Sequence, residues 1–257
     1  MDDPATAKED LVDKYDSEAK SLDTEQWLSA GNDIRVPESR AAQYFVARKV
    51  TKALDLLGKN ATNALDALEI GCSFGQMTAL LAQRFTSCTA VDLSPRSIDL
   101  AKKRLERYGV HHVRFITDDA ESVRALPSEA FDVVFSFSTI RFCPHPENAL
   151  AAIRSKLRPG GVAILDFPNR LTPWHSLVKP VLGIKPHIHD RLYTVREAKQ
   201  LFVGGGFSVD RVERFLFTSR RLPAPFLPLF RIADAALEQI PPFPAFAGII
   251  MIKGTKK

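Results

Sequence analysis

The stretch Ala67-Leu-Glu-Ile-Gly-Cys-Ser-Phe-Gly75 decides the fold of this chain. Apolar residues run into a turn of small residues, and a second apolar run, Thr89-Ala-Val91, ends at Asp92. A strand, a small-residue turn, a helix and a second strand that ends in an acid are typical of a nucleoside cofactor site in a Rossmann-like sheet. This order of elements therefore predicts an α/β fold with a ligand at the carboxyl ends of its strands.

The turn lacks the glycines that a dinucleotide needs. A dinucleotide fingerprint would place glycines at positions 71, 73 and 76, so that the backbone can approach a pyrophosphate, but this chain has Ser73 and Gln76. Glu69 at the end of the first strand would repel a pyrophosphate, whereas a carboxylate there suits a ligand that carries an ammonium group. S-adenosylmethionine has such a group and no phosphate.

These residues resemble the first motif of the class I S-adenosylmethionine-dependent methyltransferases, which reads acid-x-Gly-x-Gly-x-Gly. This chain has Glu69-x-Gly71-x-Ser73-x-Gly75, and serine is a small residue that turns accept. Later segments resemble the third strand, the fourth strand and the late Pro-Gly-Gly motif of the family, and they span residues 113–120, 131–138 and 158–166. The chain is most similar in type to small-molecule enzymes such as the ubiquinone and menaquinone methyltransferases.

The resemblance implies cofactor contacts at the strand ends. Asp92, with Leu93 beside it, would accept hydrogen bonds from the ribose hydroxyls. Asp119, followed by Ala120, would face the adenine amino group, and Asp118 is the alternative. The other cofactor-binding residues that we expect are Glu69, Gly71, Ser73, Gly75, Ser136, Tyr15 and Arg40.

Two of these candidates precede the first strand. Tyr15 belongs to Lys14-Tyr-Asp-Ser-Glu-Ala19, which resembles a segment that folds over the cofactor in relatives, although Tyr15 could equally anchor the arm to the core. Arg40 opens a predicted helix at residues 39–58 and stands where some relatives hold the cofactor's carboxylate; an ordinary surface salt bridge is the alternative. We therefore divide the chain into an N-terminal arm or lid, residues 1–38, and a methyltransferase domain, residues 39–257.

Strands and helices alternate from residue 67 to residue 166, which predicts a parallel sheet with right-handed crossovers. Two further strands are expected at Phe207–Glu213 and Ala247–Ile252. The resemblance implies a Rossmann-like, doubly wound sheet of seven strands, mostly parallel with an antiparallel final strand, plus helical lid elements. Insertions at about 170–194 and 218–244 would cap the domain.

Composition limits the other classes of function. The 257 residues, 45% of them hydrophobic, suit one large α/β domain. The three cysteines form no Cys-x-x-Cys pair, which argues against a zinc ribbon or a disulfide framework, and no secretory signal is visible, so we expect a cytoplasmic protein. The net charge of +5 combines an acidic segment, residues 1–33, with a basic one, residues 171–232. Without an interleaved basic-aromatic module or a base-flipping motif, nucleic acid is not an expected partner.

Residues 220–244 are too long and too apolar for a plain hairpin loop. Their prolines and charges rule out a membrane-spanning helix. Three interpretations stay open: a lid over an apolar substrate pocket, a peripheral contact with the inner face of a membrane, or a homodimer interface.

A hydroxyl acceptor would also need a base, and histidine is the obvious side chain at neutral pH. His145 follows the predicted fourth strand and His189 lies in the first insertion, so both are candidate catalytic residues. His187 and His189 could bind a metal, but no third ligand is evident, and we expect no metal site. The predicted function is methyl transfer from S-adenosylmethionine to a small, apolar or lipid-like acceptor such as a quinone, a phenol or a natural product. The alternatives are an S-adenosylmethionine-binding protein without methyl transfer and a nicotinamide-dependent oxidoreductase.

Overall fold

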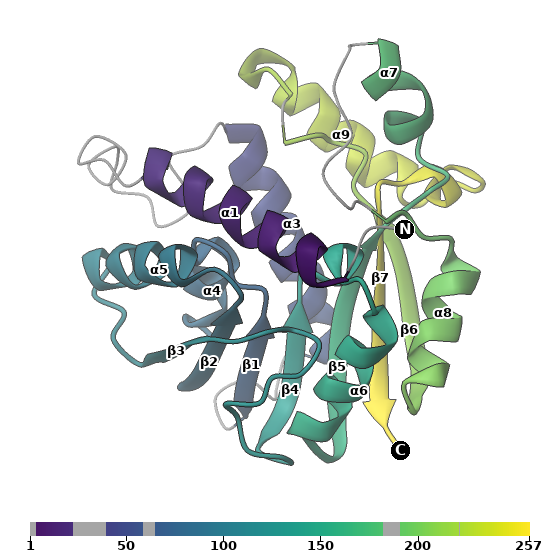
Figure 1. The fold of residues 1–257 in the computed structure, drawn as a ribbon. Coiled ribbons are helices and arrows are strands. Elements are labelled where there is room, and N and C mark those ends of the chain that lie inside the picture. Colours follow the sequence, from purple (N-terminus) through teal and green to yellow (C-terminus); the bar gives the residue numbers. More distant parts are fainter. Residues whose placement is uncertain (1–3, 23–39, 59–64, 182–190, 221) are drawn as a thin grey trace.

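The computed structural model describes residues 4–22, 40–58, 65–181, 191–220 and 222–257 (Figure 1). Its centre is one seven-stranded sheet in the order β3-β2-β1-β4-β5-β7-β6. The strands are β1 Asp66–Ile70, β2 Ser87–Asp92, β3 Val113–Thr117, β4 Phe131–Ser136, β5 Leu157–Pro168, β6 Phe207–Phe215 and β7 Ile249–Lys256. Strands β1 to β5 pair in parallel, and β7 runs antiparallel to both β5 and β6, which confirms the predicted fold class.

Two apolar cores cover the two faces of the sheet, because successive strand residues point to opposite sides. Leu68 and Val134 face the core that contains side chains of α6 (Pro146–Lys156) and α8 (Val195–Gly204). Their neighbours Ala67 and Val133 face the other core, with side chains of α3 (Arg40–Leu57) and α4 (Gln76–Leu81). This is the doubly wound arrangement that the near-continuous apolar strands predict.

Local sequence signals set the helix starts. Ser94 caps α5 (Pro95–Arg107), since its Oγ accepts a hydrogen bond from the Ser97 amide at 3.0 Å. Thr194 caps α8 with a capping box to Glu197. The predicted helix at residues 39–58 is also confirmed, as α3.

Two strand boundaries differ from the prediction. β5 begins at Leu157, directly after α6, so the Arg158-Pro-Gly-Gly161 segment lies within the strand rather than in a turn before it. The pairing with β4 shifts between Phe131 and Val133, and this irregularity accommodates Gly160 at a φ of 74°. β7 starts at Ile249 and continues to Lys256, because backbone pairing with β6 extends the strand beyond its apolar residues.

Two helical segments flank the carboxyl ends of the parallel strands. Helix α1 (Pro4–Leu22) crosses above these ends (Figure 1). The segment after β6 contains α9 (Leu227–Leu237), whose buried Asp234 accepts hydrogen bonds from the Phe217 amide at 2.6 Å and the Thr218 hydroxyl at 2.6 Å. Between β5 and α8 lie a π-helical turn (Trp174–Val178) and the short α7 (Lys179–Val181). Among the described helices, none is both long and apolar enough to cross a bilayer.

Candidate functional site

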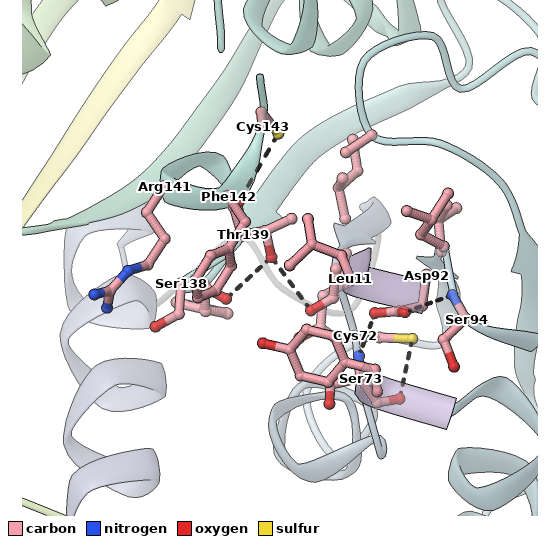
Figure 2. Close-up of a pocket in the computed structure, with 18 of the residues that line it drawn as sticks. Leu11, Cys72, Ser73, Asp92, Ser94, Ser138, Thr139, Arg141, Phe142 and Cys143 are labelled. Atoms are coloured by element: carbon pink, nitrogen blue, oxygen red, sulfur yellow. Dashed lines mark hydrogen bonds between the residues drawn. The ribbon is translucent and has the colours of Figure 1, made fainter. Parts of the chain in front are cut away.

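A cavity of about 340 Å³ lies at the carboxyl ends of β1 to β4 and beneath α1. This volume falls in the range of small-molecule sites. The strand order reverses between β1 and β4, and open α/β sheets bind their ligands at such a switch point. In Figure 2, Ser73, Asp92 and Ser94 lie to one side of the cavity and Ser138 and Arg141 to the other, with Leu11 and Thr139 between them.

The turn after β1 forms the floor of the cavity. Gly71 has a φ of 81°, and a Cβ atom there would lie only 1.8 Å from Oγ1 of Thr139, so no other residue fits without displacing the turn. Ser73, in place of the middle glycine, adopts a φ of 47°. Gly75 does not line the cavity. It has a φ of 73° and is the residue that precedes α4, and a Cβ atom there would lie 2.9 Å from Cβ of Ala101 in α5.

Glu69 is a buried carboxylate in the cavity wall, with 1% of its surface exposed. Its Oε2 accepts a hydrogen bond from Oγ1 of Thr78 at 2.6 Å, and burial raises the pKa of Glu69 to about 8. Among the residues that the structure describes, no cation pairs with Glu69. A ligand with a positive charge fits this position, because it would supply the missing counter-ion.

Asp92 holds the turn and the start of α5 together. Its Oδ2 accepts a hydrogen bond from the Ser73 amide at 2.7 Å, and its Oδ1 accepts one from the Ser94 amide at 3.0 Å. Burial raises the pKa of Asp92, and these backbone hydrogen bonds oppose that shift. The Leu93 amide also donates to this carboxylate, which has about four acceptor positions, so about one remains for a ligand hydroxyl. Leu93 lines the cavity beside it.

The two acids after β3 have different surroundings. Asp118 accepts hydrogen bonds from the backbone amides of Asp119 and Ala125, each at 2.7 Å, and so stabilises the loop that follows β3. Asp119 accepts the Glu121 amide at 2.9 Å and contacts Nζ of Lys8 at 2.7 Å. Asp118, Asp119 and Ala120 all line the cavity. We call Glu69, Asp92, Asp118, Asp119 and Glu121 the acidic side of the cavity.

Helix α1 is fastened over the cavity near both of its ends. Lys8 pairs with Asp119 and with Glu121 at 2.6 Å, whereas Asp16 accepts a short hydrogen bond from the Ser94 hydroxyl. Although burial opposes the charge of Lys8, its hydrogen bonds to both acids raise its pKa. Tyr15 lines the cavity, with its ring 6.4 Å from that of Phe142, and burial raises the pKa of its hydroxyl well above the usual range.

The opposite wall carries positive charge. Ser138 follows β4, Arg141 lies in the 3₁₀ turn Ile140–Phe142, and Arg220 lies in the segment after β6; all three line the cavity. Behind them, Lys49 of α3 and Asp166 of β5 form a buried ion pair at 2.5 Å. We call Ser138, Arg141 and Arg220 the basic side.

Comparison with known proteins identifies the domain that contains this cavity. Residues 68–165 match the family model described as a methyltransferase domain. This part of the chain is a methyltransferase domain. The recognition made from the sequence is thus confirmed, and the cofactor of this S-adenosylmethionine-dependent class is S-adenosyl-L-methionine.

Curated methyltransferases match about half of this chain. The chain is 30% identical to a malonyl-[acyl-carrier protein] O-methyltransferase of Paenibacillus sp. over 151 residues, which cover 55% of this chain and 54% of that one. It is 30% identical to a trans-aconitate 2-methyltransferase of Methylobacterium radiotolerans over 123 residues, 47% of this chain and 45% of that one. The chain thus spans about half the length of the curated relatives it matches.

The fold has close counterparts among solved structures. One is magnesium protoporphyrin IX methyltransferase of Synechocystis, solved with bound SAH, which aligns with a TM-score of 0.64 at 16% identity. The alignment covers 98% of this chain and 100% of that one. A possible histamine N-methyltransferase of Thermotoga maritima aligns with a TM-score of 0.61 at 21% identity, covering 84% and 91%. At these identities the likeness concerns the fold alone.

Several predicted site residues lie outside the cavity of the methyltransferase domain. Arg40 is exposed in the first turn of α3 and does not line the cavity. Ser136 is buried, and its hydroxyl donates to the Ile70 carbonyl at 2.9 Å, so it joins β4 to β1 beneath the cavity.

Of the two candidate histidines, His145 does not line the cavity. His145 is exposed, with Nδ1 3.4 Å from Glu147, and His189 lies outside the described residues. Within the described part of the chain, no histidine lines the cavity and no cluster of acids, histidines and cysteines could hold a metal ion.

Lys49, Asp166 and the contact of Ser138 with both were not predicted from the sequence. The sequence offers only weak signals for this pair: a lysine within a half-apolar helix and an aspartate within an apolar strand. Neither residue indicates which residue it pairs with.

Proposed function

We propose that this protein transfers a methyl group from S-adenosylmethionine to a small molecule. The observation that carries this proposal is Glu69, a buried carboxylate beside the Gly71 turn with no cationic partner among the described residues. A ligand with an ammonium group satisfies this carboxylate, and a pyrophosphate does not.

The acidic side supports a division of roles around the cofactor. Glu69 would hold the ammonium group, Asp92 and Leu93 the ribose, and Asp119 and Ala120 the adenine, while Gly71 and Ser73 let the backbone approach. Lys8 already contacts Asp119, so an adenine amino group would share that carboxylate with the lysine or displace it. Bound S-adenosylmethionine supplies an electrophilic methyl group.

The chain's own contribution would be alignment and the exclusion of water. Methyl transfer is an in-line displacement, and holding the acceptor collinear with the methyl carbon and sulfur can supply most of the acceleration. We propose that residues 1–38 act as a lid, since Lys8 and Asp16 fasten α1 across the cavity and Tyr15 closes it from above. Residues 39–257 would then form the methyltransferase domain with its two cap segments.

The acceptor is proposed to be small, with an apolar body. Phe45, Phe137, Phe142 and Pro144 give the basic side of the cavity an aromatic and apolar wall. A quinone, a phenol or a natural product fits such a wall in shape and polarity. The relatives' names mention trans-aconitate and ubiquinone biosynthesis, which support a small acceptor, and malonyl-[acyl-carrier protein], in which the malonyl group is carried by a protein; together they do not select one acceptor.

Two measurements separate this proposal from its alternatives. S-adenosylhomocysteine should raise the melting temperature of the protein and NAD should not, because only a ligand that binds the folded state stabilises it. The reverse result would indicate a nicotinamide enzyme. Incubation with isotope-labelled methyl donor and a cell extract should then yield a labelled small molecule, whereas donor binding without labelled product would indicate a binding protein.

We also propose a peripheral membrane contact through residues 220–244. Large apolar side chains are exposed there, among them Phe226 (55%), Leu229 (64%) and Ile232 (69%). Such a surface suits an interfacial contact. The protein should sediment with vesicles of anionic lipid, and Ile232→Glu should abolish this. Concentration-dependent dimerisation without vesicle binding would instead assign the surface to a homodimer.

A further inference from the structure

A buried ion pair lies directly behind the basic side of the cavity. Nζ of Lys49 is 2.5 Å from Oδ2 of Asp166, and the two side chains are 0% and 1% exposed. The Phe45 ring lies 4.9 Å from the same ammonium group. Removing two charges from water is costly, and apolar residues of similar volume often stabilise a fold as well or better. The position of this pair at a ligand cavity therefore suggests a use beyond stability.

Ser138 connects the ion pair to the cavity. Its Oγ accepts a hydrogen bond from Nζ of Lys49 at 2.7 Å, and its amide donates to Oδ1 of Asp166 at 2.5 Å. Ser138 also has a φ of 58°, a strained conformation for a non-glycine residue that occurs preferentially at functional sites. The ion pair thus fixes both the backbone and the hydroxyl of this residue.

The hydrogen-bond inventory of Ser138 leaves one group for a ligand. Because Lys49 donates to Oγ, the hydroxyl hydrogen of Ser138 must point toward a different acceptor. Ser138 is half-buried and lines the cavity, so a ligand can reach it. A neighbouring ammonium group polarises the O–H bond and makes it a stronger donor.

The charges around Ser138 favour a negative ligand group. Arg141 and Arg220 line the same part of the cavity, and both are close enough to Lys49 for their positive charge to lower its pKa further, after the larger effect of burial. Glu18 of α1 also lines the cavity, so its lining includes one carboxylate from the helix above. Arginine together with a hydroxyl donor is a strong combination for a carboxylate.

We propose that Ser138 and Arg141 bind a carboxylate group of the methyl acceptor, and that this carboxylate is the methylated group. The inference rests on the proposed methyl transfer and specifies its acceptor. Transfer to a carboxylate forms one oxygen–carbon bond, breaks one sulfur–carbon bond, cancels one negative and one positive charge, and moves no proton. It therefore needs no general base, in agreement with a cavity whose described lining residues include no histidine.

Phenylacetate and its neutral isostere phenylacetamide test this proposal, titrated into the protein saturated with S-adenosylhomocysteine. Phenylacetate should bind about tenfold or more tightly than phenylacetamide, because a hydrogen bond to a charged group is worth about 1.5–3 kcal/mol. Ser138→Ala and Arg141→Gln should each bring this ratio toward one and leave the affinity for S-adenosylhomocysteine unchanged. Ser155→Ala and Arg211→Gln, at exposed sites outside the cavity, should keep the wild-type ratio.

The proposal would be overturned by equal binding of the acid and the amide, by no binding of the acid, or by a wild-type ratio in Ser138→Ala. Binding of neutral p-cresol as tight as that of phenylacetate would point to a phenol acceptor and would also overturn it. A failure of the proposed methyltransferase function looks different, since the protein would then not bind S-adenosylhomocysteine at all.

Discussion

The acidic and basic sides of the cavity differ in charge and in their origin along the chain. The acidic side is built from the ends of β1, β2 and β3 and the loops that follow them, residues 69–121. The basic side combines the turn after β4 with Arg220 from the segment after β6, and it is supported from behind by Lys49 of α3 and Asp166 of β5. Figure 2 shows Asp92 of the acidic side across the cavity from Ser138 and Arg141 of the basic side, with Thr139 between them.

This difference indicates how the site separates two tasks. Motifs that follow consecutive strands assemble the acidic side, so the fold itself determines it. The basic side depends on contacts between segments more than 100 positions apart, such as Lys49 and Asp166, and it can therefore vary while the fold stays the same. The comparison predicts that changes on one side alter cofactor binding and changes on the other alter acceptor binding.

Gly71→Ala should have the largest effect. A Cβ at this position would lie 1.8 Å from Oγ1 of Thr139, and the φ of 81° adds backbone strain, so binding of S-adenosylhomocysteine should be lost. Gly109→Ala is the matched control, because Gly109 has a similar φ of 69° but open space around it. Calorimetry and circular dichroism would compare the two. If both variants bind equally well, the turn is not part of the cofactor site.

Asp92→Asn should weaken binding of S-adenosylhomocysteine roughly 10- to 100-fold, the usual range for hydrogen bonds to a charged group. The amide retains one acceptor oxygen, whereas its NH₂ group would oppose one of the amides of Ser73 and Ser94. Asp99→Asn, an exposed change on α5, is the control. An unchanged affinity in Asp92→Asn would contradict the assignment of the ribose to this carboxylate.

The raised pKa of Glu69 predicts a pH-dependent cofactor affinity. In the free protein the pKa is about 8, so Glu69 is largely protonated below this pH, whereas a bound ammonium group requires the carboxylate. Affinity for S-adenosylhomocysteine should therefore rise from pH 6 to pH 8, by at most about tenfold per unit. Glu69→Gln should remove this dependence. A wild-type slope in Glu69→Gln would show that another group titrates.

The raised pKa of Glu69 also affects the stability of the ligand-free protein, which should fall with rising pH whereas the cofactor affinity rises. A carboxyl pKa raised from 4.5 to about 8 contributes stability that is fully present below pH 4.5 and is lost as the pH rises through 8. The melting temperature of the ligand-free protein should thus fall between pH 5 and pH 8. Because burial also raises the pKa of Asp92, the difference between wild type and Glu69→Gln isolates the part due to Glu69.

The two sides also differ in how far the sequence predicts them. Glu69, Asp92 and Asp119 could be placed at strand ends because apolar runs define the strands and the acids follow them directly. Ser73 was predicted despite the missing glycine, since the elements around it kept their order. Arg40 and the histidines could not be placed in this way, because no strand end fixes their positions. Lys49 and Asp166 become a pair only through the packing of α3 on the sheet, which a linear pattern does not contain.

Replacing this pair gives the most specific test of the basic side. Removing Lys49 alone would leave Asp166 buried and unpaired, so the informative variant is Lys49→Met with Asp166→Leu, which should fold because apolar residues can replace a buried ion pair. Its Ser138 hydroxyl would lose the polarising ammonium, and its Ser138 amide would lose the Asp166 carboxylate that fixes it. The preference for phenylacetate over phenylacetamide should therefore fall about fivefold, which is part of the about 1.5–3 kcal/mol that a hydrogen bond to a charged group contributes. The affinity for S-adenosylhomocysteine should stay at the wild-type value. A variant that folds and keeps its full preference would show that Lys49 and Asp166 serve only the core, and that Arg141 selects the carboxylate without them.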